Sequence, residues 1–167
     1  MIDEEAIKRR IRAGVVDGLL QTQLVLSRTL RQYLSRPGGG RRYRVAKGRK
    51  NGRNLRAQGI HVASAPGQPP AVNTGRLRQS WALAGNASQK FGRGKGKQGQ
   101  DLAALTNIET ANAVGFTYGS NLKYARMLEF GTRRGLRPRP YVRPVFAVVS
   151  KRVPSIIQRA VKAVLGG

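Results

Sequence analysis

Apolar residues recur at intervals of three and four from Asp3 to about Leu34, which is the period of an amphipathic helix. Asp3 is placed to cap this helix, and the acidic pair Glu4 and Glu5 complements the positive end of its dipole. At 1.5 Å per residue the helix would be about 48 Å long, more than one small domain covers, so we expect part of its apolar stripe to meet another subunit. The stripe consists of Ile7, Ile11, Val15, Leu19, Leu20, Leu24, Leu26, Leu30 and Leu34.

Two glycines, Gly14 and Gly18, lie one turn apart inside this helix. Either they are loosely tolerated helix glycines, or they form a patch of small residues that lets a second helix approach closely. The pattern alone leaves both interpretations open.

The middle of the chain alternates apolar and polar residues over 105–110 and 113–118, which predicts two paired strands. Residues 81–83 are a candidate third strand. A short helix is expected over 122–130, ended by Gly131.

A second helical stripe runs over 143–165, with Pro144 suited to its first turn and Pro154 expected to break or kink it. We therefore predict a single α+β domain over 1–167. It has a long N-terminal helix (1–36), a basic glycine-rich insertion (37–60) and a core (61–167) with a small antiparallel sheet, a short helix and a C-terminal helix. Long basic glycine-rich loops connect these parts.

The chain is strongly basic. It has 32 Lys and Arg residues but only 7 Asp and Glu residues, which gives a formal net charge of +25. Such a chain is attracted to any polyanion, whether nucleic acid, anionic lipid or acidic protein. With 21 Gly and a mean hydropathy of -0.43, much of its length is expected to be loop.

Two glycine-rich stretches, 37–59 and 91–100, are basic and contain no acidic residue. A solvated charged surface is one interpretation, and sequence-independent contact with duplex phosphates is the other. Stacking on single strands is poorly supported, because Tyr43 and Phe91 are the main aromatics there. The predicted DNA-proximal residues are Arg41, Arg42, Arg44, Lys47, Arg49, Lys50, Arg53, Arg56, Arg93, Lys95 and Lys97.

No catalytic or metal-binding constellation emerges from the sequence. There is no Cys, and His61 is the only histidine, so we expect it to be structural or solvated. The stretch 94–99 matches G-x-G-x-x-G by chance, since no strand precedes it. Asp101, Glu109 and Glu129 lack the spacing of an acid–base pair. We expect no enzyme activity, no cofactor and no small-molecule ligand.

The N-terminus is acidic and lacks the basic and apolar regions of a signal peptide, so secretion is not expected. No apolar run approaches the roughly 20 residues that span a bilayer, and no membrane association is predicted.

Four short motifs then follow in a particular order. They are Pro66-Gly67-x-Pro69-Pro70, Thr74-Gly75-x-Leu77-x-x-Ser80, Tyr124-Ala125-x-x-Leu128-Glu129-Phe130-Gly131-Thr132 and Arg139-Pro140-Tyr141-Val142-x-Pro144. In this order they resemble the tail-completion or head–tail joining (neck) proteins of long-tailed bacteriophages, over roughly 64–165. The insertion at 37–59 is longer than the family pattern requires.

The resemblance implies a small α+β subunit that forms a ring, a hexamer being one candidate, between the portal and the tail tube. Its partners would be the portal or connector, the tail-tube proteins and double-stranded DNA in the lumen. It would reside in the virion neck after assembly in the host cytoplasm. The resemblance assigns structural or interface roles to Thr74, Gly75, Tyr124, Leu128, Glu129, Phe130, Gly131, Thr132, Pro140 and Pro144.

Within the third motif, Tyr124, Leu128 and Phe130 are expected to place apolar mass on one side of the short helix. Glu129 is then left to form an ion pair, either within the chain or with an arginine of the next subunit. The candidates within the chain are Arg126, Arg133, Arg134 and Arg137.

Alternate prolines over 137–144 are expected to hold the backbone extended, as a stiff strap into the last helix. The rival interpretation is that this segment is an arm that binds a partner.

In the second motif, Thr74 is a candidate cap for the short helix that follows it.

A charge estimate limits the role of DNA. Six copies would carry on the order of 150 positive charges, whereas duplex DNA presents roughly 18 phosphates over a 30 Å ring. Most of the charge therefore requires acidic protein neighbours.

The alternative to a neck subunit is a free, sequence-nonspecific nucleic-acid-binding protein.

Overall fold

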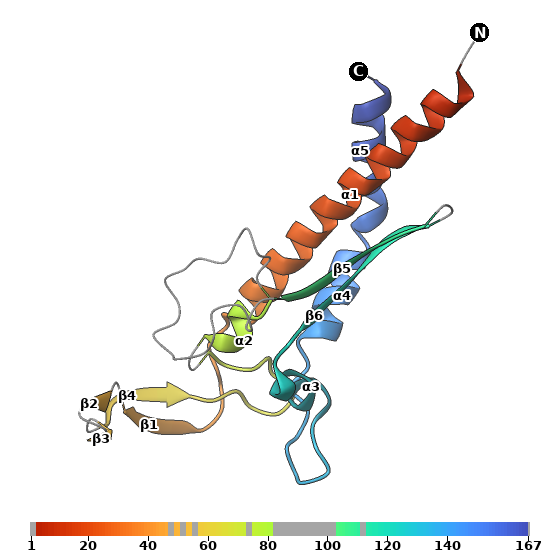
Figure 1. Cartoon of the computed structure of the whole chain (residues 1–167). Coiled ribbons are helices and arrows are strands. Elements are labelled where there is room, and N and C mark those ends of the chain that lie inside the picture. The colour runs from red at the N-terminus through yellow and green to blue at the C-terminus, as the bar shows by residue number, and fades with distance from the viewer. Residues whose placement is uncertain are drawn as a thin grey trace.

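The computed structural model describes residues 3–46, 49–50, 53–54, 57–72, 75–81, 103–110 and 113–166. The protein is elongated, with a rod of two helices at one end and a β-hairpin arm at the other (Figure 1). The mixed α+β fold predicted from the sequence is confirmed.

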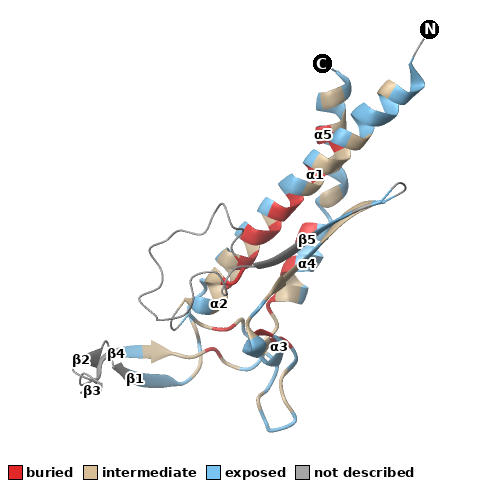
Figure 2. Ribbon diagram, in the orientation of Figure 1, coloured by how far each residue is buried: buried red, intermediate tan, exposed pale blue. Residues whose placement is uncertain are grey.

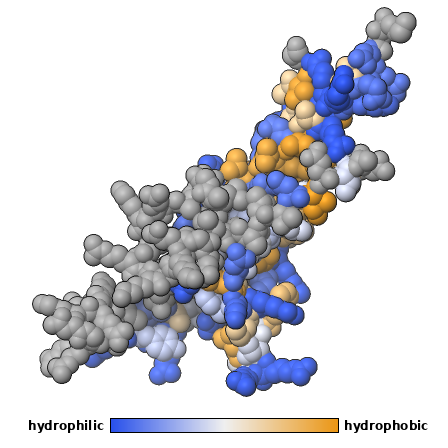
Figure 3. All heavy atoms as spheres, in the orientation of Figure 1, coloured by the Kyte–Doolittle hydropathy of each residue, from blue (hydrophilic) through white to orange (hydrophobic). Residues whose placement is uncertain are grey.

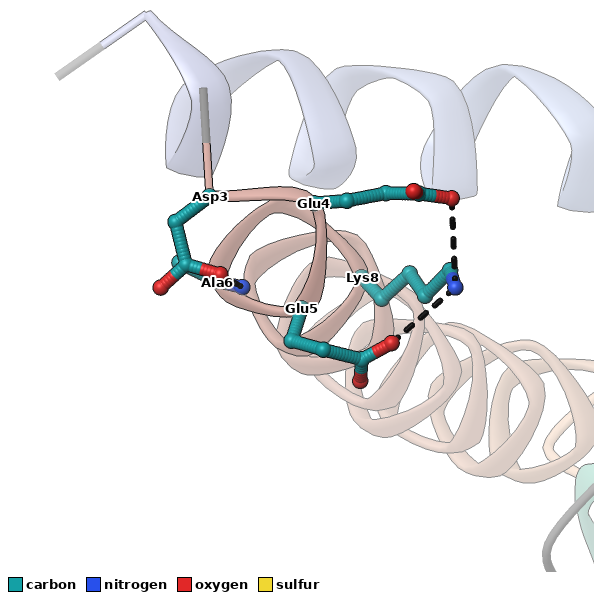
Figure 4. A network of polar contacts seen from close by, with 5 residues as sticks. All are labelled: Asp3, Glu4, Glu5, Ala6 and Lys8. Atoms are coloured by element: carbon teal, nitrogen blue, oxygen red, sulfur yellow. Dashed lines mark hydrogen bonds and ion pairs between the residues drawn. The ribbon is translucent and has the colours of Figure 1, made fainter. Parts of the chain in front are cut away.

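The rod begins with α1, a helix over Glu4–Tyr33, as the apolar period predicted. The Asp3 carboxylate accepts a hydrogen bond from the Ala6 N–H at 3.1 Å, so Asp3 is the N-cap. Lys8 bridges Glu4 at 3.3 Å and Glu5 at 3.0 Å (Figure 4). These groups are exposed, and such surface pairs add little stability.

The C-terminal stripe forms two helices, α4 over Val142–Ser150 and α5 over Val153–Leu165. Pro154 lies in the first turn of α5, so the predicted break is confirmed. α5 runs antiparallel to α1, and the Arg10 guanidinium donates to the Val164 carbonyl at its far end at 2.6 Å. This bond satisfies a carbonyl that has no partner within the helix.

The helix glycines allow this contact. A Cβ atom on Gly14 would lie 2.7 Å from the Val161 Cα, and one on Gly18 would lie 2.8 Å from the Ile157 Cα. Of the two interpretations, close helix approach is confirmed.

The predicted strand pair is confirmed as β5 (Ala103–Glu109) and β6 (Val114–Ser120), which pair antiparallel with Leu105 opposite Tyr118. Of the candidate third strand, Trp81 lies in a turn, and 82–83 lie outside the described residues. The short helices are α2 (Arg76–Gln79) and α3 (Lys123–Phe130).

The basic stretch expected to be loop contains strands. β1 (Arg42–Ala46) pairs antiparallel with β4 (Ala57–Val62), and the short β2 (Arg49–Lys50) pairs with β3 (Arg53–Asn54). The expectation of a loop was wrong there, because cross-strand pairing satisfies the backbone N–H and C=O groups of this stretch although it has few apolar side chains.

The hydrophobic core joins the C-terminal half of α1 to α4, and Figure 2 shows the buried residues gathered there. The rod's N-terminal tip and the exposed positions of the arm take no part in it. None of the described helices combines the length and apolarity needed to cross a membrane. The core cluster consists of Leu26, Leu30, Leu34, Trp81, Tyr141, Val145 and Val149.

Replacing Gly14 or Gly18 with Ala tests the α1–α5 contact. In an open helix this change stabilises by about 1 kcal/mol. Here the new methyl group meets backbone atoms, so we expect a loss of about 1–3 kcal/mol in the free energy of unfolding, measured by urea titration. Gln32→Ala, at an exposed position of α1, is the control and should change little. A more stable Gly14→Ala variant would contradict the packing.

Candidate functional site

Glu129 caps helix α4 from the neighbouring helix α3. Its carboxylate is 5% exposed and accepts hydrogen bonds from three consecutive backbone N–H groups. Those of Tyr141 and Val142 lie 2.8 and 3.0 Å from Oε2, and that of Arg143 lies 3.1 Å from Oε1. N–H groups at a helix start have no partner within the helix, and the dipole there favours negative charge. The carboxylate therefore satisfies both requirements of this helix end.

The expected ion pair of Glu129 within the chain is wrong, because its described partners are the three backbone N–H groups. The alternative, an ion pair with an arginine of the next subunit, stays a prediction. The candidate partners Arg126, Arg133, Arg134 and Arg137 are all exposed, whereas Glu129 is buried. Backbone donors reach a buried carboxylate without desolvating a second charge, which a buried salt bridge requires.

Tyr124, Leu128 and Phe130 do not lie together on one side of α3, contrary to the prediction, because Leu128 packs against the core whereas Phe130 is exposed. Ala125 and Glu129 are its buried residues, while Phe130 is 56% exposed. The Arg143 guanidinium lies 5.3 Å from the centre of the Phe130 ring, a cation–π distance. The apolar mass of the motif is thus divided between the interior and the surface.

Tyr141, at the start of α4, is almost fully buried beside Glu129. Its ring meets the Trp81 ring edge-on, with centroids 5.9 Å apart, and its hydroxyl donates to the Ala125 carbonyl at 3.3 Å. Burial, and secondarily the negative charge of Glu129, raise the pKa of Tyr141. Burial also raises the pKa of Tyr118, whose hydroxyl donates to the Trp81 carbonyl. Both rings are therefore neutral packing elements at physiological pH.

The segment after α3 is tied to the protein at several points. Gly131 ends α3 with a φ of 76°, and a Cβ atom there would lie 2.6 Å from the Leu136 carbonyl oxygen. The Arg139 N–H donates to the Leu128 carbonyl at 2.8 Å, and the Gly67 N–H donates to the Pro138 carbonyl at 3.1 Å. These bonds support the strap interpretation, with one adjustment. Because Pro144 lies inside α4, the strap ends at Tyr141.

A cavity of about 400 Å³ lies where the four motifs meet. Gly75, which has a positive φ of 78°, is the N-cap of α2, while the predicted cap Thr74 lies outside the described residues. From the motif segments, the described lining includes Ser64 and Pro70, then Gly75 and Leu77, then Tyr124 and Leu128, then Arg139.

Two buried polar atoms beside this cavity lack hydrogen-bond partners among the described residues. They are the Oγ of Ser64, a residue 3% exposed, and the Nε of Arg139. His61, expected to be structural or solvated, is half-buried and also lines the cavity. Within the described part of the chain, including this cavity, no three His, Asp or Glu side chains lie close enough together to hold a metal ion.

The basic arm presents arginines to solvent. Arg41, Arg42 and Arg44 are exposed, and the Arg41 guanidinium lies 5.5 Å from the centre of the exposed Tyr43 ring. In Figure 1 the arm projects away from the helical rod. Of the other predicted DNA-proximal residues, only the backbone of Arg49, Lys50 and Arg53 is described, in β2 and β3, while Lys47, Arg56, Arg93, Lys95 and Lys97 lie outside the described residues.

Comparison with known protein families, curated proteins and solved structures finds no match. The resemblance to phage neck proteins therefore stays a prediction from the motifs.

Sequence reasoning missed Ser64, Arg139 and Tyr141 as site residues. All three lie within or next to the motifs, so the order of the motifs was the available signal. The motif order did not show that residues of the segments 61–78 and 124–139, which are far apart in the sequence, line one cavity.

Glu129→Ala should remove the α4 cap and leave three N–H groups without their acceptor. We expect a loss of about 2–4 kcal/mol in the free energy of unfolding, and a smaller loss for Glu129→Gln, which keeps one acceptor oxygen. Denaturant titration measures both. Glu4→Ala, at an exposed acid of α1, is the control and should change little. Equal stability of the Glu129 and Glu4 variants would contradict the cap.

The buried tyrosines predict a loss of stability in alkali. The pKa of Tyr141 is raised on folding, so its contribution is present below the unfolded pKa of about 10 and is lost as pH rises above it. We expect the free energy of unfolding of Tyr141→Phe to fall less steeply above that pH than that of the original chain. Denaturant titrations across the pH range measure this, and identical slopes would contradict it.

Proposed function

We propose that this protein is a structural subunit of a phage neck. In this role it forms a ring that completes the tail and joins it to the head connector, with its basic arm near the DNA channel. The order of the four motifs and their meeting at one corner of the fold support the proposal. The observation that carries it furthest is the unpaired strand edges and exposed apolar side chains of the described elements.

The described sheets are small and have unpaired strand edges. Each described sheet has two strands, and β5 and β6 pair only with each other among the described strands. An isolated hairpin is marginally stable, and its unpaired edges are ready to bind another chain. These edges are natural contacts for neighbouring subunits.

Apolar side chains also lie exposed on α3 and α4, where Met127 is 43%, Phe130 56% and Phe146 61% exposed. More apolar surface follows the middle of the rod formed by α1 and α5 (Figure 3). Exposed apolar patches of this kind mark protein contacts.

The alternative function is a free nucleic-acid-binding protein, which the exposed arginines of the arm favour. The two functions differ in their assembly. A neck subunit forms a discrete ring in tailed particles and binds DNA modestly, whereas the alternative binds DNA tightly as a lone monomer. Mass spectrometry and an electron-microscopy reconstruction of purified particles test this. Absence of the chain from the neck would contradict the proposal.

A triple variant Arg41→Gln, Arg42→Gln, Arg44→Gln tests the role of the arm. If each arginine contacts a phosphate, the slope of log affinity for duplex DNA against log salt should fall by roughly 2–3. We expect head–tail joining to persist while DNA retention in particles falls.

The matched control carries Arg133→Gln, Arg134→Gln and Arg137→Gln, which remove the same charge from the turn and strap after α3. Its salt slope should change less. Failure of joining with normal DNA retention in the arm variant would show that the arm contacts protein.

A further inference from the structure

The outer face of α1 carries an exposed acid beside exposed leucines. Leu20 is 46% and Leu24 50% exposed, and the exposed Asp17 lies within one turn of Leu20. With about 3.6 residues per turn, these three positions lie on the side of α1 away from Leu26 and Leu30, which pack into the core. The middle of α1 therefore presents an apolar and acidic face to solvent.

A second exposed apolar surface, on α3 and α4, carries the opposite charge. Phe130 is 56% and Phe146 61% exposed, the two largest values among the large apolar side chains of the described helices. The exposed Arg143 lies one turn before Phe146 in α4, and its guanidinium is 5.3 Å from the centre of the Phe130 ring. This face is therefore apolar and cationic.

The two faces lie on different sides of the protein. α1 and α4 pack against each other, and Leu30 of α1 and Val145 of α4 belong to the same core cluster. The exposed positions of each helix point away from that shared core. Two unlike faces on different sides of a subunit make a heterologous contact, which repeats from copy to copy and closes into a ring. We infer that the α1 face of one copy binds the α3–α4 face of a second copy, where Asp17 pairs with Arg143.

Asp17 is the acid that the chain itself leaves available for such a pair. Among the acids whose side chains the structure describes, Asp3 and Glu129 cap helices, and Glu4 and Glu5 bridge to Lys8. The Asp17 carboxylate accepts a hydrogen bond from the Gln21 amide at 2.8 Å and makes no ion pair with a described residue.

A second copy fits both faces better than an acidic protein or a nucleic acid does. Either polyanion would be attracted to Arg143 but repelled by Asp17, so the leucines of the α1 face would stay exposed. A second copy covers the apolar groups of both faces and brings the opposite charges together. Exclusion of water by these apolar groups strengthens the attraction between the charges. The inference rests on the proposed function, because it names the faces through which copies would meet in the ring.

Charge reversal of the full chain tests the pairing. Asp17→Arg places two positive charges in the contact, and Arg143→Glu places two negative charges there. We expect each variant alone to self-associate at least about ten-fold more weakly than the original chain, because like charges in an interface repel. Sedimentation velocity and native mass spectrometry across a concentration series measure this.

Recombining the two changes restores opposite charges. An equimolar mixture of the two variants, and a double variant that carries both changes in one chain, should each recover the association of the original chain. The matched controls, Glu4→Arg and Arg134→Glu, alter the net charge equally at exposed positions outside both faces. Their self-association should match that of the original chain.

A neutral variant tests the apolar part of the contact. Phe146→Ser keeps the net charge and changes an exposed residue, so the fold is expected to persist, and thermal melts check this for every variant. We expect its self-association to weaken about ten-fold. Ile60→Ser, at a residue of the arm that is 59% exposed, is the control and should leave self-association unchanged.

An original chain that stays monomeric at every concentration would overturn the inference. So would a mixture and a double variant that both fail to recover association. Weakening by Asp17→Arg but not by Arg143→Glu would instead assign the α1 face to a two-fold contact with itself. Absence of the chain from particle necks would contradict the proposed function while leaving these measurements intact, so the two failures are distinguishable.

Discussion

The carboxylate of Glu129 at the start of α4 is the interaction on which the arrangement of the fold depends. Because it accepts from three successive N–H groups, it fixes both the position and the direction of α4 relative to α3. That direction carries Tyr141, Val145 and Val149 onto the C-terminal half of α1. A single negative charge is thus retained inside a strongly basic protein for a structural reason.

The pairing of α1 with α5 in the rod depends on the same placement of α4 by Glu129. Once α4 is placed, the break before α5 returns the chain along α1, where Gly14 and Gly18 let the two backbones approach. The Arg10 bond to the Val164 carbonyl closes the far end. The result is an elongated protein with a small core between α1 and α4.

Positive charge is spread along the whole molecule. Exposed basic residues lie at the rod tip, where Arg9 and Arg10 are exposed beside the acids of α1, and on the arm at the opposite end. The cavity between them joins cationic and apolar groups at the corner where the motifs meet.

The sequence by itself determined α1, the β5–β6 pair, α3 and the break at Pro154, because each is encoded locally by apolar period, alternation or proline geometry. It also marked Glu129 and the ordered motifs as important. It did not determine the partner of Glu129, the use of Gly14 and Gly18, or the hairpin in the basic stretch. Only the tertiary structure decided these, because a buried carboxylate, a close helix contact and a strand pair each depend on groups distant in sequence that folding brings together.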